Sequence, residues 1–151
     1  MKNRFLLFIG FVFVMASSSC STYSDEEISA FEEEIQAFLA EQKLVFKRTD
    51  SGLFYRFDAP GAGRNVLYTD SVIVTFTGKL LNGQLFESEQ IPLAFAVKDV
   101  IEGWQEGLCM SKQGAEIELI VPPQLGYGDH ELDKIPANSI LRYSIKVLEI
   151  R

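Results

Sequence analysis

Strand patterns lie on both sides of one short helical pattern, and this arrangement restricts the fold more than any other feature of the sequence. Apolar and polar residues alternate over 72–77 and again over 115–121, as in half-buried strands. Between them, Ile101, Trp104 and Leu108 recur at the spacing of one helical face. Strands before and after a single helix, without regular alternation of strands and helices, predict an α+β fold in which an antiparallel β-sheet wraps around one short central helix.

Further strands and turns fill the chain around this centre. The same patterns predict strands over 44–46, 53–57, 85–87, 93–97 and 141–150. The segments 49–52 and 60–63 have the composition of loops, and Asn82-Gly83 is a hairpin signal because both residues tolerate positive φ. The glycines of the second loop lack the Gly-Lys-Ser/Thr ending of a phosphate-binding loop and open no helix, which argues against a nucleotide site there.

Residues 1–19 are predicted to be a lipoprotein signal peptide and not part of the fold. Lys2 and Arg4 give a basic start, and the apolar run that follows has 12 residues, whereas a membrane-spanning helix needs about 20. Three serines then precede Cys20, which resembles the lipidated cysteine of bacterial lipoproteins, although Ser17 stands where leucine is usual. The alternative is ordinary signal cleavage nearby, with Cys20 incidental.

Residues 20–24 would then form a lipidated tether to an amphipathic helix over 25–43. Ser24 and Glu27 have the spacing of a capping box at the start of that helix. Its apolar stripe consists of Ile28, Phe31, Ile35, Phe38 and Leu39. We expect this stripe to dock on the chain's own domain, which favours a monomer, and a contact between two chains, giving a dimer, is the alternative.

The remaining residues, 44–151, are expected to form one domain. A chain of 151 residues with 47% hydrophobic content can bury one core. The net charge is −7, and it becomes −9 without residues 1–19, which carry two basic residues and no acid; this argues against nucleic acid as a partner. Cys109, the only other cysteine, is predicted to be a small buried hydrophobic residue, and no disulfide framework is expected.

The usual catalytic and metal-binding patterns are absent from the sequence. His130 is the only histidine and lies between Asp129 and Glu131, so we expect a solvated side chain. No HExxH, CxxC or GxSxG pattern occurs, and no pair of carboxylates is singled out by its spacing. The sequence therefore predicts no metal and no cofactor. Trp104, the only tryptophan, either fills the core or forms the base of a pocket.

Four segments, in order, resemble motifs of one known family. They are Val74-Thr75-Phe76-Thr77-Gly78, Gly83-Gln84-Leu85-Phe86-Glu87-Ser88, Val100-Ile101-Glu102-Gly103-Trp104-Gln105-Glu106-Gly107 and Pro122-Pro123-Gln124-Leu125-Gly126-Tyr127-Gly128. With this order and spacing, residues 49–150 resemble the FKBP-type peptidyl-prolyl cis-trans isomerases. The resemblance implies an FKBP-like fold and an enzyme, a prolyl isomerase (rotamase), that acts on proline-containing polypeptides.

Prolyl isomerisation is compatible with a chain that lacks acid–base motifs. Rotation about a peptide bond breaks no bond, and its barrier of about 18–20 kcal/mol comes from amide resonance. The twisted transition state has lost much of the charge separation of the planar amide, so a water-poor aromatic pocket binds it better than the ground state. X-Pro bonds are the natural substrate because both isomers are populated and interconvert slowly.

Carried over residue by residue, the resemblance implies a pocket with Trp104 as its floor. Its walls would be Phe76, Phe86, Val100, Ile101 and Tyr143. The family uses the backbone N–H at the position of Ile101 and the hydroxyl at the position of Tyr127 to hold substrate carbonyls. Ile135 matches the flap that closes over the proline.

Several positions depart from the best-known members of that family. Phe76 stands where a tyrosine is common, and Leu93 replaces an aromatic wall. Glu87 replaces an aspartate at the rim, and no arginine follows before Pro92 to pair with it. The flap carries Lys134 where an apolar residue is common. The apolar floor is kept and the polar rim is altered. Isomerase activity is therefore still expected, with weak activity as an alternative, and the implied binding of macrolide inhibitors is in doubt.

The leading functional hypothesis is a lipid-anchored isomerase that assists the folding of exported or envelope proteins. It would be held to a membrane of the bacterial cell envelope, in the periplasm or at the cell surface, through lipid on Cys20. A non-catalytic chaperone or binding lipoprotein that uses the same pocket, or the helix stripe, is the second hypothesis. A structural lipoprotein of a surface machine is the third, since family members occur in the gliding machinery of some bacteria.

Overall fold

The computed structural model describes residues 23–151, so the expected signal peptide and Cys20 lie outside the described residues. Its elements, in chain order, are α1 (Asp25–Gln42), β1 (Lys47–Arg48), β2 (Phe54–Asn65), β3 (Ser71–Leu80), β4 (Leu85–Ala96), the 3₁₀ turn η1 (Val97–Asp99), α2 (Glu102–Met110), β5 (Lys112–Val121), the 3₁₀ turn η2 (Pro123–Leu125) and β6 (Leu141–Ile150).

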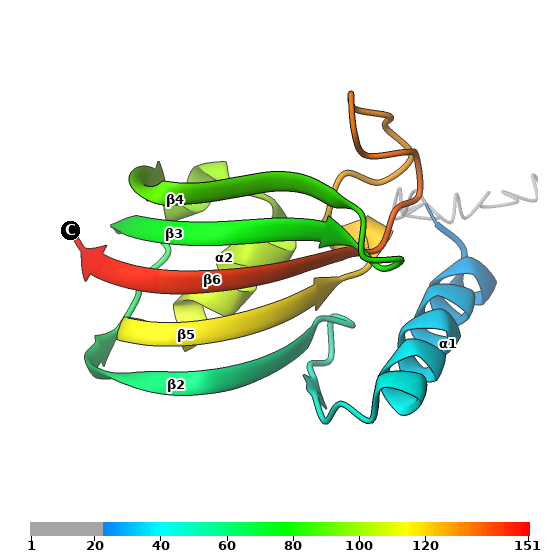
Figure 1. Cartoon of the computed structure of the whole chain (residues 1–151), viewed down its shortest axis with the longest axis horizontal. Coiled ribbons are helices and arrows are strands. Elements are labelled where there is room, and N and C mark those ends of the chain that lie inside the picture. The colour runs from blue at the N-terminus through cyan, green and yellow to red at the C-terminus, as the bar shows by residue number, and fades with distance from the viewer. Residues whose placement is uncertain (1–22) are drawn as a thin grey trace, which may run out of the picture.

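The strands form one antiparallel sheet in the order β1-β2-β5-β6-β3-β4, and α2 lies across one of its faces (Figure 1). The predicted fold class, an antiparallel sheet wrapped around one short helix, is confirmed. The helix can approach β5 closely because glycines face that strand. A Cβ added at Gly103 would lie 2.6 Å from Cγ1 of Val121, and one at Gly107 would lie 2.7 Å from both Cδ atoms of Leu119.

The first helix begins as its sequence predicts and ends with a left-handed residue. Ser24 is the N-cap, and both hydrogen bonds of the capping box with Glu27 are present. At the other end Lys43 has φ 53°, and the N–H of Leu44 donates to the Leu39 carbonyl. The predicted strand over 44–46 is therefore wrong: Leu44 belongs to the helix terminus, and strand pairing starts only at β1.

The segment 60–63 was expected to be a loop and instead lies inside β2. The pairing of β2 with β5 shifts register between Phe57 and Ala59 and again between Ala62 and Asn65. Gly61 has φ +70°, and a Cβ there would lie 2.6 Å from the Gln113 carbonyl oxygen of the partner strand. The glycine thus allows the two backbones to approach closely between the two register shifts, where a composition rule indicates a turn.

The two short strands predicted at 85–87 and 93–97 are parts of one strand, β4. Phe76 of β3 pairs with Glu89, while Val74 pairs with Leu93, so β4 bulges between these positions. Pro92 lies in this bulge. Among the described residues β4 is an edge strand, so the N–H that proline lacks is not needed to pair with a neighbouring strand.

The main core lies between the sheet and α2. Its largest contributors are fully buried residues of β3, β5 and β6, together with Trp104 and Leu108 of α2. A second cluster lies on the opposite face of the sheet, where Ile35 and Leu39 of α1 pack against Phe54, Ile120 and Ile140. The helix stripe therefore docks on its own chain, which was the first interpretation of its pattern.

Candidate active site

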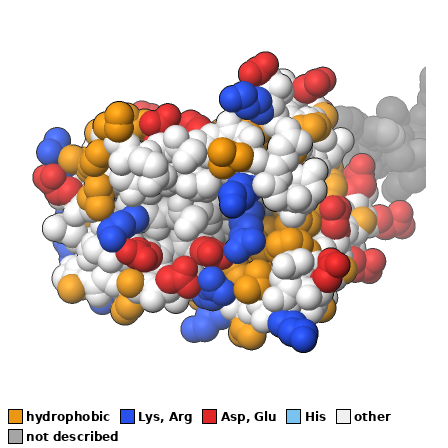
Figure 2. All heavy atoms as spheres, in the orientation of Figure 1, with side chains coloured by type: hydrophobic (Ala, Val, Ile, Leu, Met, Phe, Trp, Pro, Cys, Tyr) orange, Lys and Arg blue, Asp and Glu red, His pale blue; other side chains and the backbone are white. Residues whose placement is uncertain are grey.

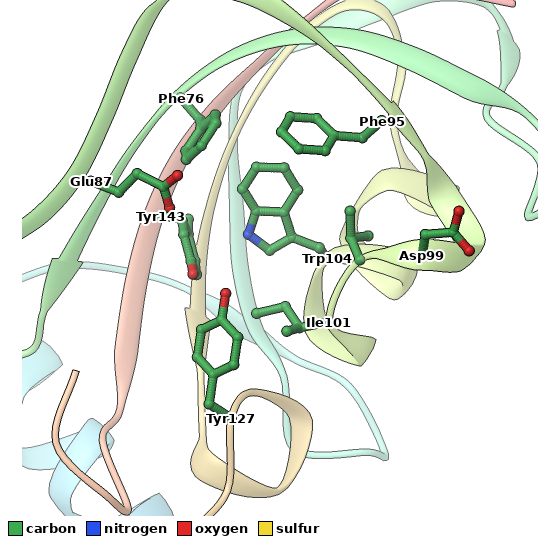
Figure 3. A pocket seen from close by; sticks show the side chains of 9 residues that line it. Phe76, Glu87, Phe95, Asp99, Ile101, Trp104, Tyr127 and Tyr143 are labelled. Atoms are coloured by element: carbon green, nitrogen blue, oxygen red, sulfur yellow. The ribbon is translucent and has the colours of Figure 1, made fainter. Parts of the chain in front are cut away.

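A pocket with a volume of about 260 Å³ opens between α2, β3, β4, β6 and the segment after η2 (Figure 3). It is lined by Phe76, Glu87, Phe95, Asp99, Val100, Ile101, Trp104, Tyr127 and Tyr143. The structure thus brings together seven of the nine predicted site residues. Phe86 and Ile135 do not line the pocket, and Phe95 and Asp99 were not predicted.

Trp104 forms the floor of this pocket and is also part of the core. Only 4% of its surface is exposed, and its ring makes edge-to-face contacts with Phe76, Tyr143 and Phe95 at centroid distances of 4.9, 5.1 and 5.9 Å. Such contacts fix the orientation of aromatic rings. The two readings left open by the sequence, core residue and pocket base, are both correct.

Tyr143 brings a hydroxyl group into an otherwise aromatic wall. Its side chain comes from β6 and is 2% exposed, and Figure 3 shows its hydroxyl close to that of Tyr127. Burial, then the charge and the hydrogen bond of Tyr127, and finally Glu87, raise the pKa of Tyr143 well above its ordinary value. The phenol is therefore neutral at physiological pH and can donate a hydrogen bond.

Tyr127 is held by the loop that follows it. The His130 N–H donates to the Tyr127 carbonyl at 3.2 Å, and the Asn138 N–H donates to the Gly128 carbonyl at 2.8 Å, which closes the loop at its base. The Tyr23 hydroxyl, just ahead of α1, donates to Oδ1 of Asn138 at 2.6 Å. The start of α1 is thus tied to the loop that borders the pocket.

Phe86 and Ile135 are core residues that do not line the pocket. The Phe86 ring is 8% exposed and packs edge-to-face on Tyr143 at 5.6 Å. It occupies the space over Gly78, where an added Cβ would lie 2.4 Å from the ring. Ile135 is 6% exposed and belongs to the main core, and it pairs with Leu132 in an isolated bridge within the loop.

Phe95 and Asp99 are the lining residues that the sequence reasoning missed. Phe95 is two residues beyond Leu93 and therefore on the same face of β4, so the strand period carried a signal for it. Its ring contacts Phe76 at 6.0 Å and replaces the aromatic wall that Leu93 lacks. Asp99 ends η1, a turn that no periodicity indicates.

The carboxylate of Glu87 lies beside Phe76 and Tyr143 (Figure 3). Burial, and to a smaller extent the charge of Glu89, raise the pKa of Glu87 above its ordinary value of 4.5. His130 lies outside the pocket, with a side chain that is 82% exposed and 3.1 Å from Asp129. Within residues 23–151, no group of three or more His, Cys, Asp or Glu side chains is arranged to hold a metal ion.

The arrangement suits an apolar ring with polar groups beside it. The aromatic walls bind the ring, while a hydroxyl from Tyr127 and the backbone around Ile101 offer hydrogen bonds at the edge. The Ile101 N–H makes no hydrogen bond with any part of the chain that the structure describes, so it is available to a ligand.

Comparison with known proteins gives a consistent family signal. The family model described as FKBP-type peptidyl-prolyl cis-trans isomerase matches residues 63–148. The FKBP-type peptidyl-prolyl cis-trans isomerase FkpA of Buchnera aphidicola subsp. Schizaphis graminum is 45% identical over 116 residues, which cover 74% of this chain and 46% of that protein. The chain thus spans about half the length of the curated relatives it matches.

Solved structures give the same signal. The crystal structure of FkpA from Escherichia coli superposes with a TM-score of 0.73 at 32% identity, covering 83% of this chain and 60% of that one. A peptidyl-prolyl cis-trans isomerase from Pseudomonas syringae superposes with a TM-score of 0.70 at 25% identity, covering 85% of this chain and 98% of that one.

Proposed function

The chain belongs to the FKBP-type peptidyl-prolyl cis-trans isomerases, an enzyme family, and from this membership we propose that the pocket over Trp104 catalyses rotation about X-Pro bonds in polypeptides. The observation that carries the proposal is the pocket itself: a tryptophan floor with aromatic walls, the hydroxyls of Tyr127 and Tyr143 at the edge, and a backbone N–H at Ile101 that makes no hydrogen bond within the described residues.

In the proposed mechanism, the proline ring lies on Trp104 between Phe76 and Phe95. Water is kept from the amide by these rings, which raises the free energy of the charge-separated planar amide relative to the twisted transition state. The Ile101 N–H and the Tyr127 hydroxyl bind substrate carbonyls and hold the chain on each side while the bond turns. No proton is transferred, because no bond is broken.

A protease-coupled assay with a proline peptide tests this proposal. We expect the purified chain to accelerate isomerisation and Trp104→Leu to lose most of that acceleration, since the floor no longer fills the pocket. Phe38→Leu, the same kind of change in the cluster under α1, is the matched control and should keep the activity. Both variants are first shown to be folded. A folded Trp104→Leu chain with the wild-type rate would refute the proposal.

We further propose that the protein acts on exported or envelope proteins while anchored by lipid on Cys20. The basic start, the short apolar run and the three serines before Cys20 support this location. None of the helices within residues 23–151 is long and apolar enough to cross a membrane.

A binding module without catalysis is the second candidate. The changed rim favours it: Phe76 brings no hydroxyl, and Leu93, in place of an aromatic wall, is 37% exposed. This candidate predicts saturable peptide binding with no acceleration, whereas the isomerase predicts both.

A further inference from the structure

Two carboxylates lie at opposite sides of the pocket without a cation between them. Glu87 comes from β4 and Asp99 from the end of η1, and Figure 3 shows them on either side of the aromatic floor. Neither side chain makes a hydrogen bond or an ion pair with any residue in the range 23–151. The other lining residues are aromatic or aliphatic.

The charges around this rim reinforce the two carboxylates. Glu89 follows Glu87 on β4, and its charge raises the pKa of Glu87. Glu102 opens α2 directly after the segment that carries Asp99. Lys98 is the basic neighbour in sequence, and it forms no ion pair within the described chain. The rim is therefore negative overall.

Two carboxylates of β5 are paired with bases. On the sheet face turned away from α2, Glu118 binds Arg56 at 3.4 Å and Arg142 at 3.0 Å, and Glu116 binds Lys146 at 2.7 Å. Figure 2 shows acidic and basic side chains next to one another over this face. The chain thus has basic residues that neutralise acids on one face, and none of them lines the pocket on the other.

The indole N–H of Trp104 is a further polar group at the base of the pocket. Nε1 of Trp104 is buried and has no hydrogen-bond partner within the described residues. Figure 3 shows that side of the indole turned toward Tyr143, inside the pocket. Because Nε1 is buried and the indole meets the Tyr143 ring edge-to-face at 5.1 Å, the floor presents an apolar surface to a ligand, and the charge of the lining comes from the two carboxylates.

We propose that this pocket selects polypeptide segments in which lysine or arginine flanks the proline. The proline ring would lie on Trp104, and the flanking cations would reach Glu87 on one side and Asp99 on the other. The inference rests on the proposed function only in taking a proline-containing polypeptide as the occupant.

The size of the expected effect follows from the exposure of the two acids. Both side chains are largely solvated, and exposed ion pairs contribute little each, which corresponds to about a two- to fivefold gain in affinity per pair. Such a gain is screened by salt, because the Debye length falls from about 10 Å at 0.1 M to about 3 Å at 1 M. Preference for basic segments should therefore be largest at low ionic strength.

Three peptides that differ only in the residues on both sides of one proline test the inference. These residues are lysine, glutamine or glutamate, and binding to the purified full chain is followed by the fluorescence of Trp104, the only tryptophan. We expect the lysine peptide to bind at least about two- to fivefold more tightly than the glutamine peptide, and the glutamate peptide to bind most weakly. The differences should shrink at 1 M salt.

Charge-removing variants locate the effect. Asp99→Asn and Glu87→Gln should each reduce the preference for lysine, and the double variant should abolish it. Glu33→Gln on α1 changes the net charge equally and lies on the opposite face of the sheet, so it should leave the preference intact. Equal affinity for the three peptides, a preference that survives in the double variant, or no binding by the folded chain would each overturn the inference.

The proposed function and this inference fail separately. A preference for lysine in binding, without any acceleration of isomerisation, would remove the isomerase and leave the inference standing. Acceleration of isomerisation with equal affinity for the three peptides would support the isomerase and overturn the inference.

Discussion

Tyr127 and Tyr143 place two hydroxyl groups beside each other at the edge of the pocket (Figure 3). One comes from the segment after η2 and the other from β6, while Phe76 on β3 brings a ring alone. A hydrogen bond between them would leave the Tyr127 hydroxyl with a fixed direction. The pair is therefore expected to act as a unit on a substrate carbonyl.

Removing one hydroxyl tests this pair. Tyr127→Phe loses a hydrogen bond that contributes about 0.5–1.5 kcal/mol, so kcat/KM should fall about two- to tenfold. Tyr143→Phe keeps its ring contacts and should lose less, and the double variant should lose less than the sum of the two because the hydroxyls are coupled. Steady-state assays on the three folded variants measure this. A wild-type rate for Tyr127→Phe would remove the hydroxyl from the mechanism.

Glu87 gives a pH dependence of stability with a defined sign. Its pKa in the folded chain lies above the unfolded value, so the folded state binds this proton more tightly. Stability therefore falls as pH rises through the folded pKa, by a small amount because the side chain is largely exposed. Glu87→Gln should be as stable as wild type at pH 4 and slightly more stable at pH 7, as measured by urea unfolding. Lower stability of the variant at pH 7 would contradict this.

At the scale of elements, the packing of α2 against β5 determines where the pocket floor lies. Gly103 precedes Trp104 and faces Val121, a fully buried β-branched residue. A side chain at Gly103 would push the helix away from the strand and move the indole with it. The glycine therefore couples the packing of the helix to the geometry of the pocket.

Gly103→Ala tests that coupling. Overpacking costs about 1–3 kcal/mol, more than the about 0.5–1 kcal/mol that alanine gains over glycine in a helix. We expect a net loss of about 1–2 kcal/mol in the free energy of unfolding by denaturant. Glu102→Ala, at the neighbouring exposed position, should stay within about 0.5 kcal/mol of wild type. An equal or higher stability of Gly103→Ala would show that the contact is loose.

The sequence predicts the elements whose apolar residues recur at a regular spacing. It misses the features that depend on contact with another segment of the chain. The strands β3, β5 and β6 alternate over most of their length, and the face of α2 repeats at helical spacing. The sheet, the helix and seven lining residues therefore follow from the pattern and the family resemblance. The close approach of the two backbones at Gly61 depends on β5, which no local pattern records. Asp99 enters the pocket through a short 3₁₀ turn whose direction is set by packing.

At the scale of the whole molecule, the N-terminus joins the domain beside the loop that borders the pocket. Tyr23 is 7% exposed, contacts Phe31 of α1 edge-to-face at 5.3 Å and binds Asn138 of that loop. Cys20 precedes Tyr23 by three positions. If lipid is attached to Cys20, the pocket would therefore work close to the membrane surface.

Cys20→Ala tests the anchor. One acyl chain alone gives marginal membrane binding, whereas two or more give stable attachment. We expect the wild-type chain in the membrane fraction of the producing cell and the variant in the soluble fraction, as followed by immunoblot. A variant that stayed with the membrane after a high-salt wash would exclude lipid on Cys20 as the anchor.

The central claim is that the pocket over Trp104 catalyses rotation about X-Pro bonds. The exchange rate between the cis and trans isomers of a proline peptide tests this claim most directly. Magnetisation-transfer NMR measures this rate at equilibrium and needs no protease. With a catalytic amount of the folded chain, we predict exchange well above the uncatalysed rate, and little acceleration with folded Trp104→Leu. Exchange at the uncatalysed rate, in the presence of a wild-type chain that binds the same peptide, would contradict the claim.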